Sequence, residues 1–507
     1  MKLSRLSLIL AALLTSHSSF AEIPATLEQQ QSALRSGKLS ATELLQYYEQ
    51  QIAARNPATG AVQALDPQAK QVAARIDQQK KYKGALTGLP LLLKDNIDAQ
   101  GMITTAGSLA LAENLVQKDA PLVARLRAAG AVIVGKTNLS EWANLRSSKS
   151  TSGWSSAGAQ VRNPYDLSRS PCGSSSGSGA AVAARMIPAA IGTETDGSIV
   201  CPASVNGLVG LKPTVGLVSR TGIVPISHTQ DTAGPMTLTV KDAALLLNVM
   251  AGSDPADPAT LEADKRRRKD YAKGLSRNGL QGRRLGLVRQ LAEGYDAETK
   301  ALFQRSLAIL KAAGATVVEV DLPGLEELDK DELTVLLYDF KADLNQYLAA
   351  TPATVKYRQM ADVIAFNQAQ AERVMPYFGQ DLMEQAQTTS GLQDPVYLAA
   401  AARIRQKAGI QGIDDTMRRH GLDALIAPTT GTAWPIDYKA GDVIEGSAST
   451  PAAVAGYPHL TVPMGLVRGL PVGLSFFGHA WGEARLLQLG YAFEKARPAL
   501  PAPQLVR

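Results

Sequence analysis

The sequence predicts an α/β fold in which helices cover a central β-sheet. Two apolar runs, Leu91–Leu93 and Ala131–Val134, have the length and composition of buried strands, and helical segments alternate with them along the chain. Alternation of this kind favours a sheet that is covered on both faces. With 45% hydrophobic and 19% charged residues among 507, the chain is typical of a globular protein and not of a disordered one.

The first 21 residues are expected to be a secretory signal peptide and not part of the fold. Lys2 and Arg5 precede the apolar run Leu6–Leu14, and Ser19–Ala21 provides small residues for cleavage after Ala21. The run is shorter than the about 20 apolar residues that span a bilayer. We therefore expect a mature chain of residues 22–507 that is exported, most simply to a bacterial periplasm, without stable insertion in a membrane.

The N-terminal part of the mature chain is predicted to be helical. Residues 26–56 form two predicted helices that are separated at Gly37–Lys38, and Ser40 with Glu43 fits a capping box that starts the second helix. Residues 64–81 predict another charged helix. The strand at Leu91–Leu93 follows, and then a helix and the strand Ala131–Val134.

The rest of the chain changes character twice. Residues 145–240 are rich in Gly, Ser and Thr and poor in charge, which suits a site where the backbone approaches a ligand closely. Residues 255–422 are charged and helical in pattern, so we expect a largely helical cover region there. Three apolar strands and a final helix are predicted at 422–428, 460–463, 471–477 and 485–495. We expect residues 22–507 to form one domain.

One motif match is not expected to bind a nucleotide. Gly130–Thr137 has the spacing of a phosphate-binding loop, but such a loop needs free backbone N–H groups to hold phosphate. The four spacer residues here are all apolar and are better explained as the buried strand itself. The net charge of +6 is spread thinly over the chain, so we expect no nucleic-acid partner.

A second match, Gly173–Gly177, has the pattern of the nucleophile elbow of α/β-hydrolases, with Ser175 as the nucleophile. That mechanism needs an acid and then a histidine later in the chain. The available histidines are His228, His420, His459 and His479. No local pattern marks any of them as a base, so each is better explained as a buried, hydrogen-bonded histidine or a surface one.

Three other segments are more specific when taken together. They are LLLKDNID with Lys94, CGSSSGSGAAVAA with Ser174, and IGTETDGSIVCPA with Ser198. In combination they resemble the amidase signature family, and the resemblance covers essentially the whole mature chain. Supporting segments are GKTNLSEWAN at 135–144, NGLVGLKPTVGLVSR at 206–220, QDTAGPM at 230–236 and AGYPHLTVPMG at 455–465.

The resemblance implies both a fold and a catalytic set. The family fold is a single catalytic domain with a large, mixed and twisted β-sheet that helices cover on both faces. By resemblance, Ser198 is the nucleophile, Lys94 is the base, and Ser174 bridges the two. The family also implies a cis peptide bond between Gly173 and Ser174. It implies no cofactor, no metal ion and no required partner subunit.

The chemistry of these residues is coherent in itself. A serine hydroxyl is a poor nucleophile until a base takes its proton, and lysine is a base only when neutral. Burial disfavours the ammonium form, and Leu91–Leu93 place Lys94 at the end of an apolar strand. Asp95 is adjacent, but neighbouring strand residues point to opposite faces. The turn after the second motif would supply backbone N–H groups as an oxyanion hole, from Thr195, Asp196, Gly197 and Ser198.

Two details stay open in the sequence. Asp196 stands where many family members carry glycine, and its side chain either accepts hydrogen bonds within the loop or contacts an amine of the substrate. Cys172 and Cys201 flank the two serine motifs. Export permits a disulfide between them, but their places beside packed turns favour small buried residues, so we expect free thiols.

The resemblance is strongest to bacterial family members that act on peptide amides. It implies hydrolysis of the C-terminal carboxamide of peptides through an acyl-enzyme, with release of ammonia. The alternatives are an amidase for small or aryl amides, an amidotransferase-type subunit that hydrolyses glutamine, and a non-catalytic periplasmic binding protein. The signal peptide argues against the amidotransferase, and the intact set of Lys94, Ser174 and Ser198 argues against the binding protein.

Overall fold

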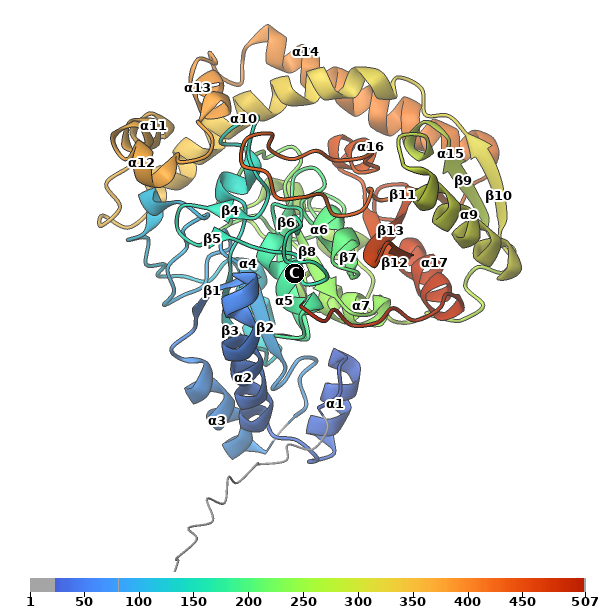
Figure 1. Cartoon of the computed structure of the whole chain (residues 1–507), viewed down its shortest axis with the longest axis horizontal. Coiled ribbons are helices and arrows are strands. Elements are labelled where there is room, and N and C mark those ends of the chain that lie inside the picture. The colour runs from blue at the N-terminus through green and yellow to red at the C-terminus, as the bar shows by residue number, and fades with distance from the viewer. Residues whose placement is uncertain (1–22, 81, 506–507) are drawn as a thin grey trace, which may run out of the picture.

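An 11-stranded mixed β-sheet runs through the molecule, with helices packed against it (Figure 1). The computed structural model describes residues 23–80 and 82–505, so the predicted signal peptide lies outside the described residues. The strand order is β1-β3-β2-β6-β8-β7-β12-β13-β11-β9-β10. This mixed, helix-covered sheet confirms the α/β fold that the sequence predicts.

The strands include every run that the sequence analysis predicted as a strand. The bounds are β1 Val62–Leu65, β2 Pro90–Lys94, β3 Val132–Thr137, β6 Ala189–Glu194, β7 Val209–Lys212, β8 Thr232–Thr237, β9 Arg284–Val288, β10 Thr316–Val320, β11 Ala424–Pro428, β12 His459–Val467 and β13 Leu470–Phe477. A separate two-stranded sheet pairs β4 Trp154–Ser155 with β5 Ala159–Gln160.

The candidate site lies where two parallel strands end. β2 pairs in parallel with β3 on one side and with β6 on the other, and Leu93 lies opposite Ile191. β2 therefore ends at Lys94 beside the end of β6 at Glu194. Because the carboxyl ends of neighbouring parallel strands meet at one edge of a sheet, Lys94 and the turn after β6 are brought together.

Two groups of helices pack against the sheet. α5 and α6 contact each other and the central strands, and α2 packs on α5, whereas α4 and α17 both pack on α7. The helices are α1 Leu27–Arg35, α2 Ala41–Thr59, α3 Ala69–Gln79, α4 Pro121–Ala128, α5 Ser176–Ala183, α6 Val200–Val205, α7 Val240–Met250, α8 Ala263–Arg266, α9 Ala297–Ala312, α10 Leu328–Ala350, α11 Met360–Ala369, α12 Ala371–Val374, α13 Asp381–Gln387, α14 Pro395–Ile404, α15 Asp415–His420, α16 Thr450–Val454 and α17 Glu483–Ala496.

The predicted N-terminal helices are present. α1 ends before Gly37, whose positive φ of 70° suits glycine, and α2 begins after Ser40. The Ser40 hydroxyl accepts from the backbone N–H of Glu43, and the Glu43 carboxylate accepts from the backbone N–H of Ser40. This reciprocal pair is the capping box that the sequence predicts.

The region predicted as a helical cover also contains two strands. Residues 255–422 hold α8 to α15, but β9 and β10 pair in parallel within the same region, and β9 joins the main sheet through β11. β10 is the last strand of the sheet and exposes Glu319, and Arg284 of β9 is exposed as well. These exposed charges masked the strand pattern in the sequence.

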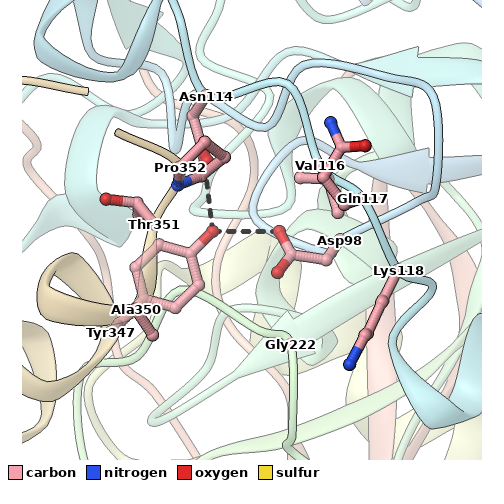
Figure 2. A pocket seen from close by; sticks show the side chains of 10 residues that line it. All are labelled: Asp98, Asn114, Val116, Gln117, Lys118, Gly222, Tyr347, Ala350, Thr351 and Pro352. Carbon is pink, nitrogen blue, oxygen red and sulfur yellow. Dashed lines mark hydrogen bonds between the residues drawn. The ribbon is translucent and has the colours of Figure 1, made fainter. Parts of the chain in front are cut away.

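The long helix α10 crosses the top of the molecule in the view of Figure 1, with α14 beside it. Its C-terminal end is held by Tyr347, which donates to Asp98 Oδ1 at 2.9 Å and accepts from Asn114 Nδ2 at 3.0 Å. These three side chains lie together in the wall of a cavity of about 420 Å³ (Figure 2). The contact ties α10 to the loop that follows β2.

The middle and the N-terminal half of α10 are tied to the loop before β8. Ser227 Oγ donates to Asp339 Oδ2 at 2.7 Å, and Gln230 Nε2 donates to Glu332 Oε1 at 2.7 Å. Phe340 and its neighbours on α10 also pack in a second hydrophobic cluster, separate from the main core around the sheet. α10 is therefore fixed along its length. Among the described residues, no helix is both long and apolar enough to span a membrane.

Candidate active site

Lys94 is the last residue of β2 and is fully buried. Its Nζ lies 2.7 Å from Ser174 Oγ, 2.8 Å from Thr193 Oγ1 and 3.1 Å from the Thr193 carbonyl oxygen. A neutral amine has two N–H donors and one lone pair. The two oxygens of Thr193 match the donors, and the Ser174 hydroxyl matches the lone pair.

Burial lowers the pKa of Lys94 to about 7, and the carboxylates of Asp231 and Glu194 only partly oppose this shift. The adjacent Asp95 does not pair with Lys94. It points to the other side and accepts from Lys136 Nζ at 3.2 Å. The expected separation of Lys94 and Asp95 is confirmed, so a large fraction of Lys94 is neutral near pH 7.

Ser174 follows a cis peptide bond from Gly173, as the resemblance implied, and is fully buried. The next residue, Ser175, donates its hydroxyl proton to the Thr193 carbonyl oxygen at 3.0 Å, and its backbone N–H donates to the Ser198 carbonyl oxygen at 3.1 Å. Ser175 thus ties the two serine-bearing segments to each other. Its buried, bonded hydroxyl is not the exposed nucleophile of an elbow motif.

Ser198 lies in the turn between β6 and α6. Gly197 in this turn has a φ of 76°, and a Cβ there would approach Ser449 Oγ to 3.1 Å. The Glu194 carboxylate accepts from the backbone N–H groups of Ile199 at 2.7 Å and Val200 at 2.9 Å, at the start of α6. This contact fixes the direction in which the chain leaves Ser198.

The turn leaves backbone donors free. In the described part of the chain, the N–H groups of Thr195, Asp196, Gly197 and Ser198 have no protein acceptor. All four residues line a cavity of about 400 Å³. The predicted oxyanion-hole residues therefore present unused donors next to the predicted nucleophile, whereas Lys94 and Ser174 are not among the residues that line the cavity.

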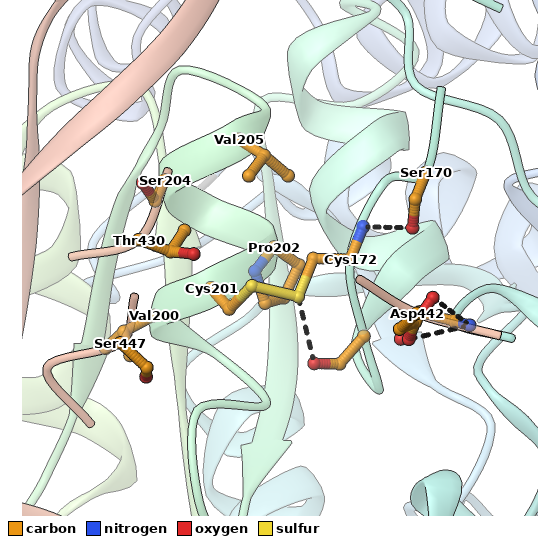
Figure 3. The surroundings of a disulfide bond; sticks show 12 residues. Ser170, Cys172, Val200, Cys201, Pro202, Ser204, Val205, Thr430, Asp442 and Ser447 are labelled. Atoms are coloured by element: carbon orange, nitrogen blue, oxygen red, sulfur yellow. Dashed lines mark hydrogen bonds between the residues drawn. A yellow bond between two sulfur atoms is a disulfide. The ribbon is translucent and has the colours of Figure 1, made fainter. Parts of the chain in front are cut away.

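The expectation of free thiols was wrong. Cys172 and Cys201 form a disulfide bond, shown with its surroundings in Figure 3. Because Ser175 and Ser198 are joined through the backbone, the two serine turns lie side by side and bring the two Cα atoms to 6.0 Å. The bond links the segment of Ser174 to the segment of Ser198, and both cysteines line the cavity.

Three carboxyl groups line the same cavity: Asp196, Glu332 and Asp442. Asp196 Oδ2 accepts from Thr450 Oγ1 at 2.8 Å, so its side chain does accept a hydrogen bond near the turn. Burial raises the pKa of each of the three groups. Glu332 comes from α10 and Asp442 from the loop before α16, and no motif in the sequence marked either of them. Thr193 lies in the segment IGTETDGSIVCPA but was not singled out there.

The other sequence candidates do not contribute to this cavity. Gly130–Thr137 is mostly β3, as predicted, and its backbone pairs with β1 and β2. None of the four histidines lines the cavity. His459 is buried with its Nε2 at 2.6 Å from Ser475 Oγ, while the Nδ1 atoms of His228 and His479 lie 3.0 Å from Asp343 and 2.6 Å from Asp414.

The model of the Amidase family matches residues 43–487 of the chain. A probable amidase from Arabidopsis thaliana is 37% identical, over 96% of this chain and 93% of the relative. A glutamyl-tRNA(Gln) amidotransferase subunit from Symbiobacterium thermophilum is 36% identical, over 92% of this chain and 96% of the relative. Both similarities extend over nearly the whole length of the proteins.

Two solved structures are more similar still. The native peptide amidase from Stenotrophomonas maltophilia has a TM-score of 0.90 and 50% identity, over 95% of this chain and 98% of the other. The peptide amidase PAM in complex with the competitive inhibitor chymostatin has a TM-score of 0.91 and 51% identity, over 94% and 99%. The helical cover is therefore part of the similarity, together with the sheet.

Proposed function

The chain belongs to the amidase family, and on that premise we propose that it removes the C-terminal carboxamide of peptides and releases ammonia. Its fold is the amidase signature fold, and it is an amide hydrolase. The observation that carries the proposed mechanism is the contact of 2.7 Å between Lys94 Nζ and Ser174 Oγ, in the segment that the backbone of Ser175 joins to Ser198. The half-identical peptide amidase from Stenotrophomonas maltophilia supports the substrate class.

In the proposed reaction, the proton moves away from the nucleophile in two steps. Ser174 passes its hydroxyl proton to the neutral Lys94 amine and takes a proton from Ser198. Ser198 Oγ then forms a bond to the amide carbon. The electron pair of the carbonyl bond moves to its oxygen, where the free backbone N–H groups of the turn stabilise the negative charge.

Collapse of this intermediate breaks the bond between carbon and nitrogen. Ser174 returns a proton to the leaving nitrogen, Lys94 reprotonates Ser174, and ammonia leaves. Ser198 is then held as an ester, the acyl-enzyme. A water molecule, deprotonated along the same path, attacks this ester and releases the peptide acid.

The protein is further proposed to be exported and to work without a partner subunit. The Cys172–Cys201 disulfide supports an oxidising compartment, where such bonds persist. N-terminal sequencing of the secreted protein tests this point, with a new terminus at Glu22 expected. A terminus at Met1 in a protein that stays inside the cell would overturn it.

The function is tested by ammonia release from two substrates, a dipeptide amide and a simple aromatic amide. We expect faster turnover of the dipeptide amide, and its loss in both Ser198→Ala and Lys94→Ala. A preference for the aromatic amide would instead support the small-amide or aryl-amide alternative. Full activity in Lys94→Ala would overturn the proposed mechanism, and ammonia release from glutamine alone would favour the amidotransferase type.

A further inference from the structure

The cavity beside Ser198 is lined, in the described chain, by acidic side chains and not by basic ones. Its lining contains the carboxyl groups of Asp196, Glu332 and Asp442 and, among the described residues, no lysine, arginine or histidine. Asp442 is fully engaged, because it accepts from the Ser152 backbone N–H at 3.1 Å and from Trp434 Nε1 at 2.9 Å. Asp196 and Glu332 are therefore the acidic groups that remain for a ligand.

The lining also lacks hydrogen-bond donors for two of its own atoms. Asp196 Oδ1 and Asn144 Oδ1 are buried and have no donor partner in the described chain. The other end of the Asn144 amide is engaged, since Nδ2 donates to Ser152 Oγ at 3.1 Å. Both unpartnered atoms of the lining are acceptors, so the missing partner is a group that donates. A buried acceptor without a partner is costly, and a ligand N–H group removes that cost.

Asp196 and Glu332 both line this cavity, and the negative charge of Asp196 acts on Glu332. Burial, with a smaller contribution from the negative charge of Asp196, raises the pKa of Glu332 well above its ordinary value. Both carboxyl groups line a cavity whose described lining offers them no cation.

The position of Glu332 is fixed by the docking of α10. Only 7% of Glu332 is exposed, and its Oε1 accepts from Gln230 Nε2 at 2.7 Å. The contacts of Tyr347 at the far end of the same helix, drawn in Figure 2, prevent α10 from sliding along the core. A rigid helix thus holds one carboxyl of the pair over the turn that carries the other.

On the basis of the proposed function, we propose that the Asp196–Glu332 pair binds the cationic amino group of short peptide amides. An ammonium group supplies the missing donors and the missing positive charge together. A cavity of about 400 Å³ encloses a small substrate. The substrate class is then amino-acid and dipeptide amides with a free amino terminus.

The test compares two substrates that differ only in charge: a dipeptide amide with a free amino group and its N-acetyl derivative. In the wild type we expect kcat/KM to favour the free amine by about tenfold or more, since a charged hydrogen bond is strong. In Glu332→Gln this preference should fall toward unity, and the readout is the ratio of the two kcat/KM values, so a general change in activity cancels. Glu327→Gln is the matched control, because Glu327 precedes α10, is paired with Lys407 and does not line the cavity.

A second measurement does not depend on the variant. Ethylammonium ions should competitively inhibit turnover of the N-acetyl amide by the wild type, and ethanol at the same concentration should not. Equal kcat/KM values for the two substrates, a preference that survives Glu332→Gln, or equal inhibition by ethanol would each overturn the inference. In those cases amide hydrolysis itself persists, whereas a wild type that hydrolyses neither amide overturns the proposed function.

Discussion

Lys94 Nζ lies 2.7 Å from Ser174 Oγ in a fully buried position, and among the described residues its only other polar partner is Thr193. No carboxylate forms an ion pair with Lys94 in the described chain, since Asp95 is taken by Lys136. The arrangement favours the neutral amine, which is the form that can accept a proton from a serine. The rise of catalytic activity with pH should therefore follow the deprotonation of Lys94.

We expect kcat/KM to rise with pH through about 7 and to level off above it, because burial lowers the pKa of Lys94 to about 7 and the active form is the neutral one. Lys94→Arg keeps a cation that stays protonated, so its activity should fall by about 10²–10⁴-fold at every pH. The measurement is a pH–rate profile on a peptide amide, with melting temperatures to verify folding. A folded Lys94→Arg protein with the wild-type profile would contradict this role.

A second prediction concerns Glu194, which we regard as a positioning residue. It accepts from the N–H groups of Ile199 and Val200 and so holds the turn of Ser198. Glu194→Ala should lower kcat by roughly 10²-fold with little change in KM, since a small displacement of a reacting group has that effect. Glu194→Gln keeps an acceptor oxygen and should recover most of the activity.

Glu194→Ala and Glu194→Gln also separate two effects of Glu194, its hold on the backbone of the Ser198 turn and the influence of its charge on Lys94. The Glu194 carboxylate raises the pKa of Lys94 against the larger effect of burial. Its loss should lower that pKa further, so the rising limb of the pH–rate profile should move to lower pH in Glu194→Gln. An unshifted limb would show that Glu194 acts through the backbone of the turn alone.

The residues that could be predicted from the sequence are those with local signals. Lys94 follows an apolar run, and Ser174 and Ser198 lie in Gly- and Ser-rich turns, but it was the resemblance of the three segments to the amidase signature family that marked them. Glu332 and Asp442 have no such signal, because they reach the cavity only through the docking of α10 and of the loop before α16. Long-range packing of this kind leaves no trace in a local pattern.

The cysteines illustrate the same limit. Each was placed correctly beside a serine motif, but the motifs were treated separately, and only the backbone contact between Ser175 and Ser198 shows that the two turns touch. Likewise, β9 and β10 were hidden because an edge strand exposes charges that a central strand does not. The sequence therefore predicted β2, β3, β11, β12 and β13, but it missed the central strands β6, β7 and β8, which lie in a stretch rich in Gly, Ser and Thr.

A third prediction concerns the Cys172–Cys201 bond, which joins positions 29 residues apart. The double variant Cys172→Ser/Cys201→Ser should lose about 2–4 kcal/mol of unfolding free energy, as loops of this length do when opened. It should also lose activity, because the turns of Ser174 and Ser198 are less firmly joined. Denaturant unfolding and kcat measure the two effects. A thiol reductant should weaken the wild type and leave the double variant unchanged; equal sensitivity of both would contradict the assignment.

The last prediction is an acid sensitivity that originates at His459. This histidine is fully buried, its Nε2 lies 2.6 Å from Ser475 Oγ, and its Nδ1 has no partner in the described chain. Burial, with a smaller contribution from the nearby Lys212 charge, lowers its pKa from 6.5 to about 3. Between these two values the unfolded chain binds a proton at His459 that the folded chain does not.

Proton uptake at His459 in the unfolded chain should therefore lower the free energy of unfolding of the wild type by about 1.4 kcal/mol for each pH unit below 6.5. Buried carboxyls act in the opposite direction, because burial raises the pKa of Asp231 and of Asp242 to about 6, and the folded state then binds protons more readily.

The contribution of His459 is therefore measured as a difference between a His459 variant and the wild type. In His459→Gln, the loss of unfolding free energy from pH 6.5 to pH 5 should be smaller than in the wild type, whereas the exposed His420→Gln should follow the wild type. Parallel curves for His459→Gln and the wild type would mean that this histidine takes up its proton in the folded state too.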